Sequence, residues 1–370
     1  MPYRSQDIYK GKRKFRTPLL ILLFVLAFLV VGAVLAFYGL QQFIVYGEDG
    51  VSLEFHKSEE PAVVETAPVV VTPDVTGMQV NIVFREPDFS DVSLPVGEDT
   101  PELHARLIPF SEVRDSVKLA AAVASAQEAG CDTVVLEMKD HSGQLAWASA
   151  VPQAAAYGTN GTTVFADVIA PLKEKGLTVI AKLSVCADDL MAVRNWPISL
   201  LTAEGMPYKD ESGHYWLDPY GRELRSYALA LMQELAALGF DEIWLDDLCH
   251  PSAEPENLRY SVTLRGAPNA HSAVCQLARK LAEGMQDSGV KLGVFVDSSM
   301  LTGEDALSGQ DAELFWRLFD RMCVYTTNDY YESDRSAALA LGGSDARFVP
   351  AFSWSPSEAA GGYMVYIPEE

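Results

Sequence analysis

The sequence predicts an α/β protein whose parallel strands and connecting helices close into a (β/α)8 barrel. Three observations lead to this prediction. From residue 104 onward, short runs rich in β-branched and aromatic residues alternate with amphipathic stretches of helical period. There are eight such runs, as a closed barrel requires. A doubly wound open sheet is the alternative, but no GxGxxG or GxxxxGK[ST] motif follows any run.

The N-terminal part precedes this pattern and contains an uncharged run, residues 19–40. As a helix it would extend about 33 Å, enough to cross a bilayer. Basic residues lie on its N-terminal side, which places the following chain outside the cell. A cleaved signal peptide is the rival interpretation. However, the apolar run is longer than the hydrophobic region of a typical signal peptide, and no A-x-A cleavage site follows it. We therefore expect a cytoplasmic basic tail (1–17), a transmembrane signal anchor (18–40) in the cell membrane, and a bacterial extracytoplasmic domain.

Residues 47–78 are rich in Glu, Pro, Val and Thr and lack helical periodicity, which indicates an extended linker over 41–78. The barrel domain is then expected over 79–370. We predict strands at 104–109, 132–138, 178–185, 241–246, 291–297, 321–326, 347–353 and 363–367. We predict helices near 114–129, 164–176, 222–239, 271–288 and 334–341. The eighth strand ends close to Glu370, so no outer helix is expected after it.

The charge distribution limits the possible partners. The formal net charge is −23, and residues 1–17 carry six basic residues against Asp7, so the remainder carries −28. A body this acidic repels phosphate backbones, which excludes nucleic acid as an electrostatically attracted partner. The negative charge of this part of the chain is better matched to neutral or cationic ligands.

The alternation within each run indicates which side chains enter the barrel. In the run that begins at residue 132, Val134, Leu136 and Met138 form the apolar phase that faces the helices. The opposite phase points inward, and its last member reaches the C-terminal mouth, where barrel enzymes place their chemistry. Applied to four strands, this rule gives an inward polar set: Glu137, Lys139, Lys182, Ser184, Asp246 and Asp297.

Carboxyl groups that converge at such a mouth suit the hydrolysis of glycosidic bonds. One protonates the leaving oxygen, and the other attacks the anomeric carbon or activates water. Asp246 and Asp297 end neighbouring predicted strands, so each can raise the pKa of the other. The pattern favours catalytic roles for Asp246, Asp297 and Glu137.

Three segments resemble a known family. Residues 134–143, VVLEMKDHSG, are similar to its V-V-I-D-V-K-D-x-S-G strand and turn. Residues 216–220, WLDPY, resemble its W-L-D-P-Y loop, and residues 239–246, GFDEIWLD, resemble G-F-D-E-I-Q-F-D. The family comprises the glycoside hydrolase domains of secreted and membrane-anchored bacterial proteins, which are TIM barrels of the α-amylase-like hydrolase superfamily. The resemblance implies a retaining barrel with Asp246 as the nucleophile.

The chain departs from the family where D-Y-V-R-F-P is usual. Residues 246–251 read DDLCHP, so Cys249 replaces the arginine and Asp247 the tyrosine. An arginine beside a nucleophilic carboxylate keeps it ionised and hydrogen-bonded. Lys139 or Lys182 could take over that task.

The same segment contains residue types that serve other chemistries. Asp246, Asp247, Cys249 and His250 are zinc-type ligands, but adjacent residues rarely converge on one ion, so neither a metal nor a cofactor is expected. A Cys249 nucleophile with His250 is equally disfavoured, because Cys-His pairs normally meet through the fold. The five cysteines lack CxxC spacing, and Cys186 could approach Cys249 from an adjacent strand end.

The leading hypothesis is a glycosidase acting on an extracellular or cell-wall polysaccharide. Trp216 is expected to stack on a sugar ring. The full set of predicted substrate contacts is Lys139, Asp140, Lys182, Trp216, Asp218, Asp247 and Tyr325. The missing arginine motivates a second hypothesis, a catalytically inactive barrel that binds cell-surface glycan. A third, a metal-dependent deacetylase or hydrolase, requires stoichiometric metal in the purified protein.

Overall fold

The computed structural model describes residues 44–47, 50–53, 88–90, 92, 100–251, 258–259, 270–303, 307–357 and 360–367. The chain divides into two units, residues 1–79 and residues 80–370. In the first unit, β1 (Ile44–Gly47) pairs with β2 (Gly50–Leu53) as an antiparallel hairpin inside the predicted linker. The predicted transmembrane segment, 18–40, lies outside the described residues, and a search of the described helices finds none with the length and hydropathy to cross a bilayer.

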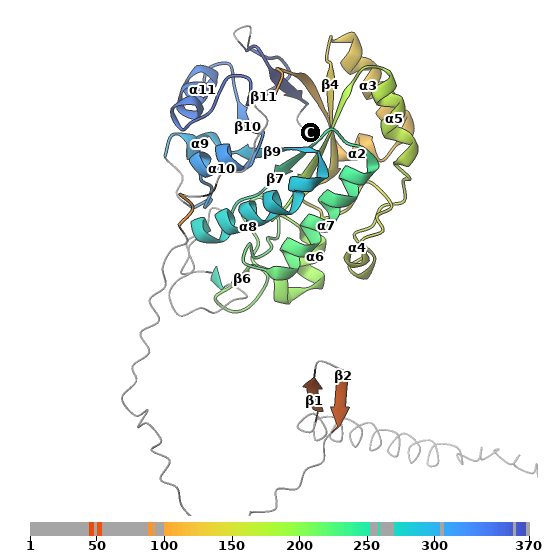
Figure 1. The fold of residues 1–370 in the computed structure, drawn as a ribbon, viewed down its shortest axis with the longest axis vertical. Helices are drawn as coiled ribbons and strands as arrows, with labels where there is room; N and C mark the ends of the chain where they lie inside the picture. Colours follow the sequence, from red (N-terminus) through yellow and green to blue (C-terminus); the bar gives the residue numbers. More distant parts are fainter. Residues whose placement is uncertain are drawn as a thin grey trace, which may run out of the picture. The chain divides into compact units, whose positions relative to one another are not determined.

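The second unit is a closed barrel of eight parallel strands, which confirms the predicted fold class (Figure 1). The strands follow one another around the barrel in sequence order. All eight predicted strands are present, each within a residue or two of its predicted ends. They are β3 (His104–Ile108), β4 (Thr133–Lys139), β5 (Thr178–Ser184), β7 (Glu242–Asp246), β9 (Lys291–Val296), β10 (Arg321–Thr326), β11 (Phe348–Ser353) and β12 (Tyr363–Tyr366). A short antiparallel pair, β6 (Leu201–Thr202) with β8 (Leu258–Arg259), lies outside the barrel sheet.

The helices lie around this sheet (Figure 1). The five predicted ones are confirmed as α3 (Ser116–Glu128), α5 (Ala166–Glu174), α7 (Arg222–Leu238), α8 (Ala270–Met285) and α11 (Tyr331–Ala340). Shorter helical segments were not predicted, because three to seven residues show too little periodicity. These are α2 (Phe110–Val113), α4 (Pro152–Ala156), α6 (Asp189–Arg194), η3 (Trp196–Ile198), α9 (Ser298–Leu301) and α10 (Ala312–Leu318). The short helix η5 (Gln286–Ser288) follows α8 directly and lies within the helix predicted near 271–288.

Aspartate side chains begin three of these helices. Asp115 precedes α3, Asp188 precedes α6 and Asp311 precedes α10, and each carboxylate accepts a backbone N–H from the first turn. Such caps satisfy donors that have no partner within the helix, and each contributes on the order of 1 kcal/mol. The chain before each of these helices therefore turns into the helix at a defined residue.

The barrel interior is filled by one side-chain phase of the strands, as predicted. Val135, Ile180, Trp244 and Phe295 form a buried cluster inside the barrel, while the other phase packs against the helices. One inward assignment is wrong. A shift in the register between β4 and β5 pairs Lys139 with a residue of the helix-facing phase. This bulge turns the Lys139 side chain out of the interior.

The N-terminal end of the barrel is closed by an ion pair. Arg321 Nε lies 2.9 Å from Glu242 Oε2, and both side chains are buried. Trp244 Nε1 donates to the same carboxylate at 2.8 Å, and Arg321 also donates to the carbonyl oxygens of Pro101 and Ala346. Both barrel ends carry a hollow, of about 490 Å³ at this end and about 580 Å³ at the other, but the charged groups of Glu242 and Arg321 are already paired with each other.

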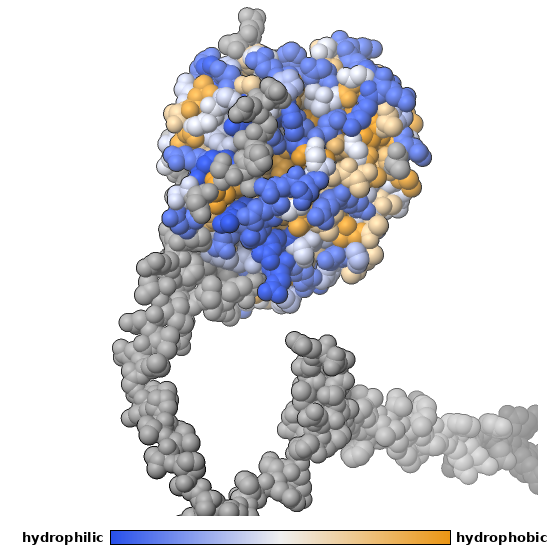
Figure 2. Space-filling model, viewed as in Figure 1, coloured by the Kyte–Doolittle hydropathy of each residue, from blue (hydrophilic) through white to orange (hydrophobic). Residues whose placement is uncertain are grey.

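The outer surface of the barrel unit is mixed. The face seen in Figure 2 is largely hydrophilic, and hydrophobic residues occupy smaller areas between the hydrophilic ones. Large exposed apolar side chains such as Val117, Trp196 and Trp354 come from separate elements.

Candidate active site

A cavity of about 580 Å³ opens at the C-terminal ends of the barrel strands. This is the end at which barrel enzymes carry their active sites. Seven of the predicted site residues line it: Glu137, Asp140, Lys182, Asp246, Asp247, Asp297 and Tyr325. Leu107, Pro109, His141, Ser142, Asp189, His214, Tyr366 and Ile367 complete the lining.

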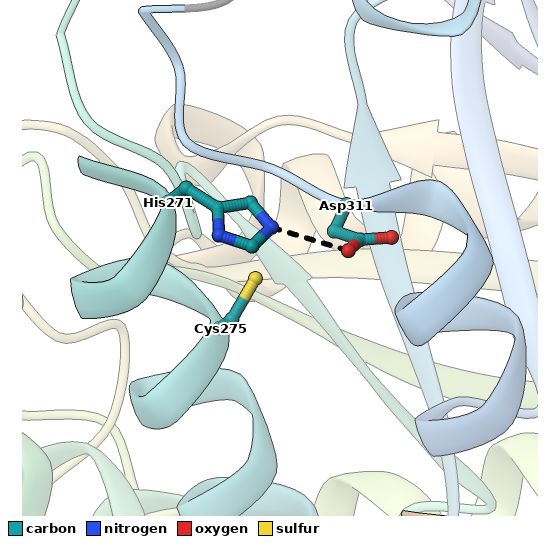
Figure 3. Close-up of side chains that lie close together, drawn as sticks. All are labelled: His271, Cys275 and Asp311. Carbon is teal, nitrogen blue, oxygen red and sulfur yellow. Dashed lines mark hydrogen bonds and ion pairs between the residues drawn. The ribbon is translucent and has the colours of Figure 1, made fainter. Parts of the chain in front are cut away.

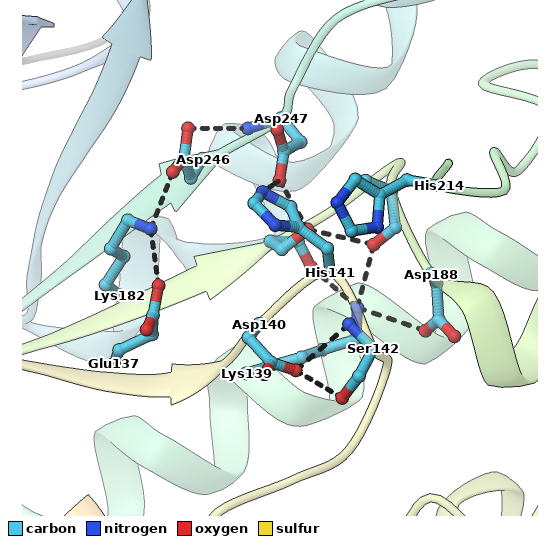
Figure 4. Close-up of polar contacts among 12 residues, drawn as sticks. Glu137, Lys139, Asp140, His141, Ser142, Lys182, Asp188, His214, Asp246 and Asp247 are labelled. Carbon is cyan, nitrogen blue, oxygen red and sulfur yellow. Dashed lines mark hydrogen bonds and ion pairs between the residues drawn. The ribbon is translucent and has the colours of Figure 1, made fainter. Parts of the chain in front are cut away.

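A single buried lysine joins two of the predicted catalytic carboxylates (Figure 4). Lys182 Nζ lies 2.7 Å from Asp246 Oδ2 and 2.8 Å from Glu137 Oε1. Glu137 Oε2 also accepts the backbone N–H of Phe110 at 2.9 Å. Lys182 comes from β5, between β4 and β7, so parallel pairing of three consecutive barrel strands brings these groups together.

Asp246 is also held from the opposite wall. The Tyr325 hydroxyl donates to Asp246 Oδ2 at 3.2 Å, and the backbone N–H of Asp247 donates to Oδ1 at 2.9 Å. Phe295 stacks on Tyr325 with ring centroids 5.0 Å apart, and Lys182 Nζ lies 5.6 Å from the Phe295 ring centroid. Both carboxylate oxygens of Asp246 therefore have fixed donors.

Asp247 has a separate set of partners. Its Oδ2 lies 3.2 Å from His141 Nε2 and accepts the Ser184 hydroxyl at 2.5 Å. The backbone at Asp247 adopts a left-handed conformation, with φ 51°. Because non-glycine residues adopt this conformation at an energetic cost, Asp247 is held there by its surroundings, next to the end of β7.

The charges of the cluster follow from these contacts. Burial raises the pKa of Asp246 and the Lys182 ammonium opposes this. Burial also acts to raise the pKa of Asp247, but the hydrogen bond from His141 keeps this pKa below its ordinary value. The pKa of Lys182 is well above its ordinary value, since Asp246, Tyr325 and Glu137 together outweigh the effect of burial. Burial likewise acts to raise the pKa of Glu137, but the nearby Lys182 ammonium lowers it below its ordinary value.

A second wall follows β4, and of its residues the sequence predicted Asp140 but missed His141, Ser142, Asp189 and His214. The bond to Asp247 raises the pKa of His141 to about 9, against the effect of burial. Its ring lies 4.7 Å from the ring of His214, whose Nδ1 is 3.4 Å from Asp189 Oδ2. Burial raises the pKa of Asp140, which accepts the Ser142 hydroxyl at 2.5 Å. The sequence signal for His141 and Ser142 was their place directly after a strand, in the segment D-H-S. Loop residues follow no periodic pattern, so the directions of these side chains could not be predicted.

Three predicted substrate contacts do not line the cavity. Lys139 Nζ is 3.0 Å from Asp188 and donates to Ser184 O at 2.8 Å, in a buried position behind the mouth. Trp216 is buried, and its indole N–H donates to Asp210 at 2.8 Å. Asp218 is fully buried and accepts the backbone N–H of Tyr220 in the turn before α7. Their positions indicate structural roles.

The cysteine and metal alternatives at this end are not formed. All five cysteines are free thiols, so Cys186 and Cys249 are not paired. His250 Nδ1 donates to the Pro251 carbonyl oxygen at 2.8 Å. Within the described ranges, the segment from Asp246 to His250 makes no group of three or more potential metal ligands.

Comparison with known proteins identifies a family. The model of a family described as "Putative glycosyl hydrolase domain" matches residues 107–331, which include every predicted residue that lines the cavity. No curated protein matches the sequence.

One of the similar solved structures shares the fold. The glycoside hydrolase domain of PgaB (BpsB) from Bordetella bronchiseptica superimposes with a TM-score of 0.52 at 10% identity, covering 72% of this chain and 94% of that one. A hypothetical protein from Ruminiclostridium thermocellum is 21% identical, with 51% and 95% coverage and a TM-score of 0.45. A chitinase from Chromobacterium violaceum is 12% identical, with 68% coverage of each chain and a TM-score of 0.41.

Proposed function

Because the chain belongs to this family of glycosyl hydrolase domains, we propose that it is a glycosidase that hydrolyses an extracellular or cell-wall polysaccharide with two carboxyl groups. The observation that carries the proposal is the arrangement of Asp246. It stands at the end of a barrel strand, in the cavity, with a buried ammonium on one oxygen and hydrogen-bond donors on both. This arrangement suits a nucleophile, because the donors fix its direction and Lys182 favours its charged form.

The second carboxyl group is assigned to Asp297. A general acid must carry a proton, yet Lys182 lowers the pKa of Glu137 and lies between Glu137 and Asp246. No sugar can therefore fit between those two carboxylates. Asp297 is exposed, lines the same cavity and follows β9, which pairs directly with β7. Asp140, whose pKa burial raises, is the competing candidate for the acid.

The proposed reaction has two steps. Asp246 attacks the anomeric carbon while Asp297 donates a proton to the glycosidic oxygen, so the bond to the leaving sugar breaks and a glycosyl ester forms. The Asp297 carboxylate then takes a proton from water, and the resulting hydroxide displaces Asp246 from the anomeric carbon. One water is consumed, and both carboxyl groups return to their starting states.

The cavity charge supports a preference among sugars. Six carboxyl groups line it, from Glu137, Asp140, Asp189, Asp246, Asp247 and Asp297, against the three basic side chains of His141, Lys182 and His214. Such an excess of acid repels uronic acids and favours neutral or amino sugars. With an anchor at 18–40, the barrel would meet such polymers outside the cell.

Product release tests the proposal. The full chain would be incubated with neutral glucans, chitin and chitosan oligosaccharides, peptidoglycan fragments and polyuronates, and new reducing ends would be measured. A fluorinated analogue of the released sugar would then trap the ester for peptide mass spectrometry. We expect the adduct on Asp246. An adduct on another residue contradicts the assignment of the nucleophile.

Azide separates the two candidate acids. Azide is an anionic nucleophile that attacks the glycosyl ester without a general base, so it restores turnover when the acid/base residue is missing, provided that the substrate has a leaving group that needs no proton. We expect azide to rescue Asp297→Ala. Rescue of Asp140→Ala alone would move the role to Asp140.

The second candidate function is glycan binding without hydrolysis. The observation that favours it is that Cys249 stands where the family usually carries an arginine. Equal glycan affinity of the wild type and Asp246→Asn, with no product from either, would support binding alone.

A further inference from the structure

We propose that His271, Cys275 and Asp311 form a zinc site that joins the beginnings of α8 and α10 (Figure 3). These residues do not line the cavity at the barrel mouth. The proposal is independent of the glycosidase activity, because it concerns ion binding by a different group of side chains.

The geometry brings three donors together from two elements. His271 and Cys275 are one helical turn apart on α8, so their side chains share a face. Asp311 is the residue that caps α10, and its Oδ2 lies 3.2 Å from His271 Nε2. One ligand atom from each residue lies within 4.8 Å of the other two. Figure 3 shows all three side chains directed toward one point.

The donor set suits zinc. Zinc binds imidazole nitrogen, thiolate sulfur and carboxylate oxygen at roughly 2.0–2.3 Å, and tetrahedral ligands are then about 3.3–3.8 Å apart. The distance of 3.2 Å from His271 to Asp311 is already close to this value, and the Cys275 sulfur lies within 4.8 Å of a ligand atom of each of the other two residues. Magnesium and calcium prefer oxygen ligands alone, so sulfur and nitrogen select a softer ion.

Zinc would replace the hydrogen bond between His271 Nε2 and Asp311 Oδ2 and leave the helix cap of Asp311 in place. Asp311 Oδ1 accepts the backbone N–H of Leu314 at 2.9 Å, so the helix cap uses the oxygen that the ion does not need. The Cys275 thiol contacts the Gly309 carbonyl oxygen at 3.8 Å, which is a weak interaction. The His271 side chain is 43% exposed, and this gives an ion access from solvent. On binding, the thiol proton of Cys275 is released to solvent.

The site would stabilise a loop that contacts the barrel mouth. Gln310 Nε2 donates to Phe295 O at 3.0 Å, and Gln310 Oε1 accepts the backbone N–H of Asp297 at 3.3 Å. Ser308 O accepts the backbone N–H of His250 at 2.7 Å. Gly309 packs so closely on Ala270 that a Cβ there would lie 2.4 Å from the Ala270 carbonyl carbon. A metal on Asp311 would therefore hold residues 308–311 against the ends of β7 and β9.

Zinc and cobalt binding by the full chain test the proposal. We expect one zinc per chain after dialysis against metal-free buffer. Cobalt in its place should give a sulfur-to-cobalt charge-transfer band in the near ultraviolet. Cys275→Ala should abolish this band and weaken zinc binding at least a hundredfold. Cys131→Ala, which removes a partly buried thiol outside the cluster, is the matched control and should bind as the wild type does.

Asp311→Asn separates metal binding from folding. Asparagine caps helices as well as aspartate does, so the fold is retained while a charged ligand is lost. Zinc should raise the unfolding temperature of the wild type and of Cys131→Ala, and raise that of Asp311→Asn much less. Absence of zinc and of the cobalt band in folded wild type would overturn the proposal. So would weak binding that is equal in the wild type, Cys275→Ala and Asp311→Asn, since this indicates adventitious ions.

Discussion

Lys182 Nζ lies 2.7 Å from Asp246 Oδ2 in a position where its side chain is 4% exposed. The same ammonium is 2.8 Å from Glu137, so one buried cation serves two carboxylates at the base of the cavity. Removing one member of a buried charge group leaves the others without compensation, which costs far more than the loss of an exposed pair. The group of Glu137, Lys182 and Asp246 is therefore sensitive to the loss of the Lys182 charge.

Replacing Lys182 with methionine keeps the length of the side chain and removes its charge. We expect Lys182→Met to lose about 3–5 kcal/mol of unfolding free energy, measured with urea, because two buried carboxylates lose their partner. Lys173→Met is the matched control, since Lys173 pairs with Asp241 where both side chains are more than a third exposed. It should lose less than about 1 kcal/mol. Equal losses would contradict a special role for Lys182.

Tyr325 provides a milder perturbation of the same carboxylate. Tyr325→Phe removes the hydroxyl that donates to Asp246 Oδ2 and leaves the ring stacked on Phe295. A hydrogen bond to a charged group contributes about 1.5–3 kcal/mol, so kcat should fall roughly ten- to hundredfold with little effect on folding. Tyr330→Phe, at an exposed tyrosine on the surface, should leave kcat unchanged. An unchanged kcat in Tyr325→Phe would remove Tyr325 from the site.

The His141–Asp247 pair makes stability depend on pH. The folded protein raises the pKa of His141 from 6.5 to about 9, so the pair stabilises the fold fully below about pH 6.5 and this contribution disappears as the pH rises through 9. The difference in unfolding free energy between the wild type and His141→Gln should shrink over that range. An NMR titration should place the His141 midpoint near 9, and a midpoint near 6.5 would show that the ion pair is absent in solution.

Gly143 ends the D-x-S-G turn beside the candidate site. Its φ is +81°, and a Cβ there would lie 1.9 Å from Asp188 Oδ1, which is the oxygen that caps α6. Gly130 has the same φ with nothing within 4 Å of a Cβ, so it isolates the cost of the backbone conformation. Gly130→Ala should lose about 1–2 kcal/mol. Gly143→Ala should lose clearly more, by thermal or urea unfolding, because Asp188 and its ion pair with Lys139 must move.

Much of the barrel could be predicted because its strands obey a simple alternation. The apolar phase of Val134, Leu136 and Met138 faces the helices, and the opposite phase places Glu137 in the cavity. Lys139 breaks the rule because one extra residue in β4 reverses the side-chain direction. Alternation in one strand cannot reveal such a bulge, since it depends on the pairing with β5.

The loops at the barrel mouth were harder to predict. His141 and His214 approach each other although they are far apart in sequence, and only the fold brings them together. Trp216 and Asp218 are the opposite case, because they were predicted as substrate contacts and do not line the cavity. Their residue types suggested sugar contacts, but Trp216 bonds to Asp210 and Asp218 holds the turn before α7. Polar residues in a loop can therefore serve the backbone as readily as a ligand.

The most direct test of the account compares the wild type with Asp246→Asn on whichever glycan yields product. Asparagine is nearly isosteric, so both proteins should show the same circular dichroism and similar glycan affinity. The account predicts sugar release by the wild type and at least a thousandfold slower release by Asp246→Asn, because an amide cannot act as the nucleophile. Release by Asp246→Asn at the wild-type rate would contradict the central claim that Asp246 carries the reaction.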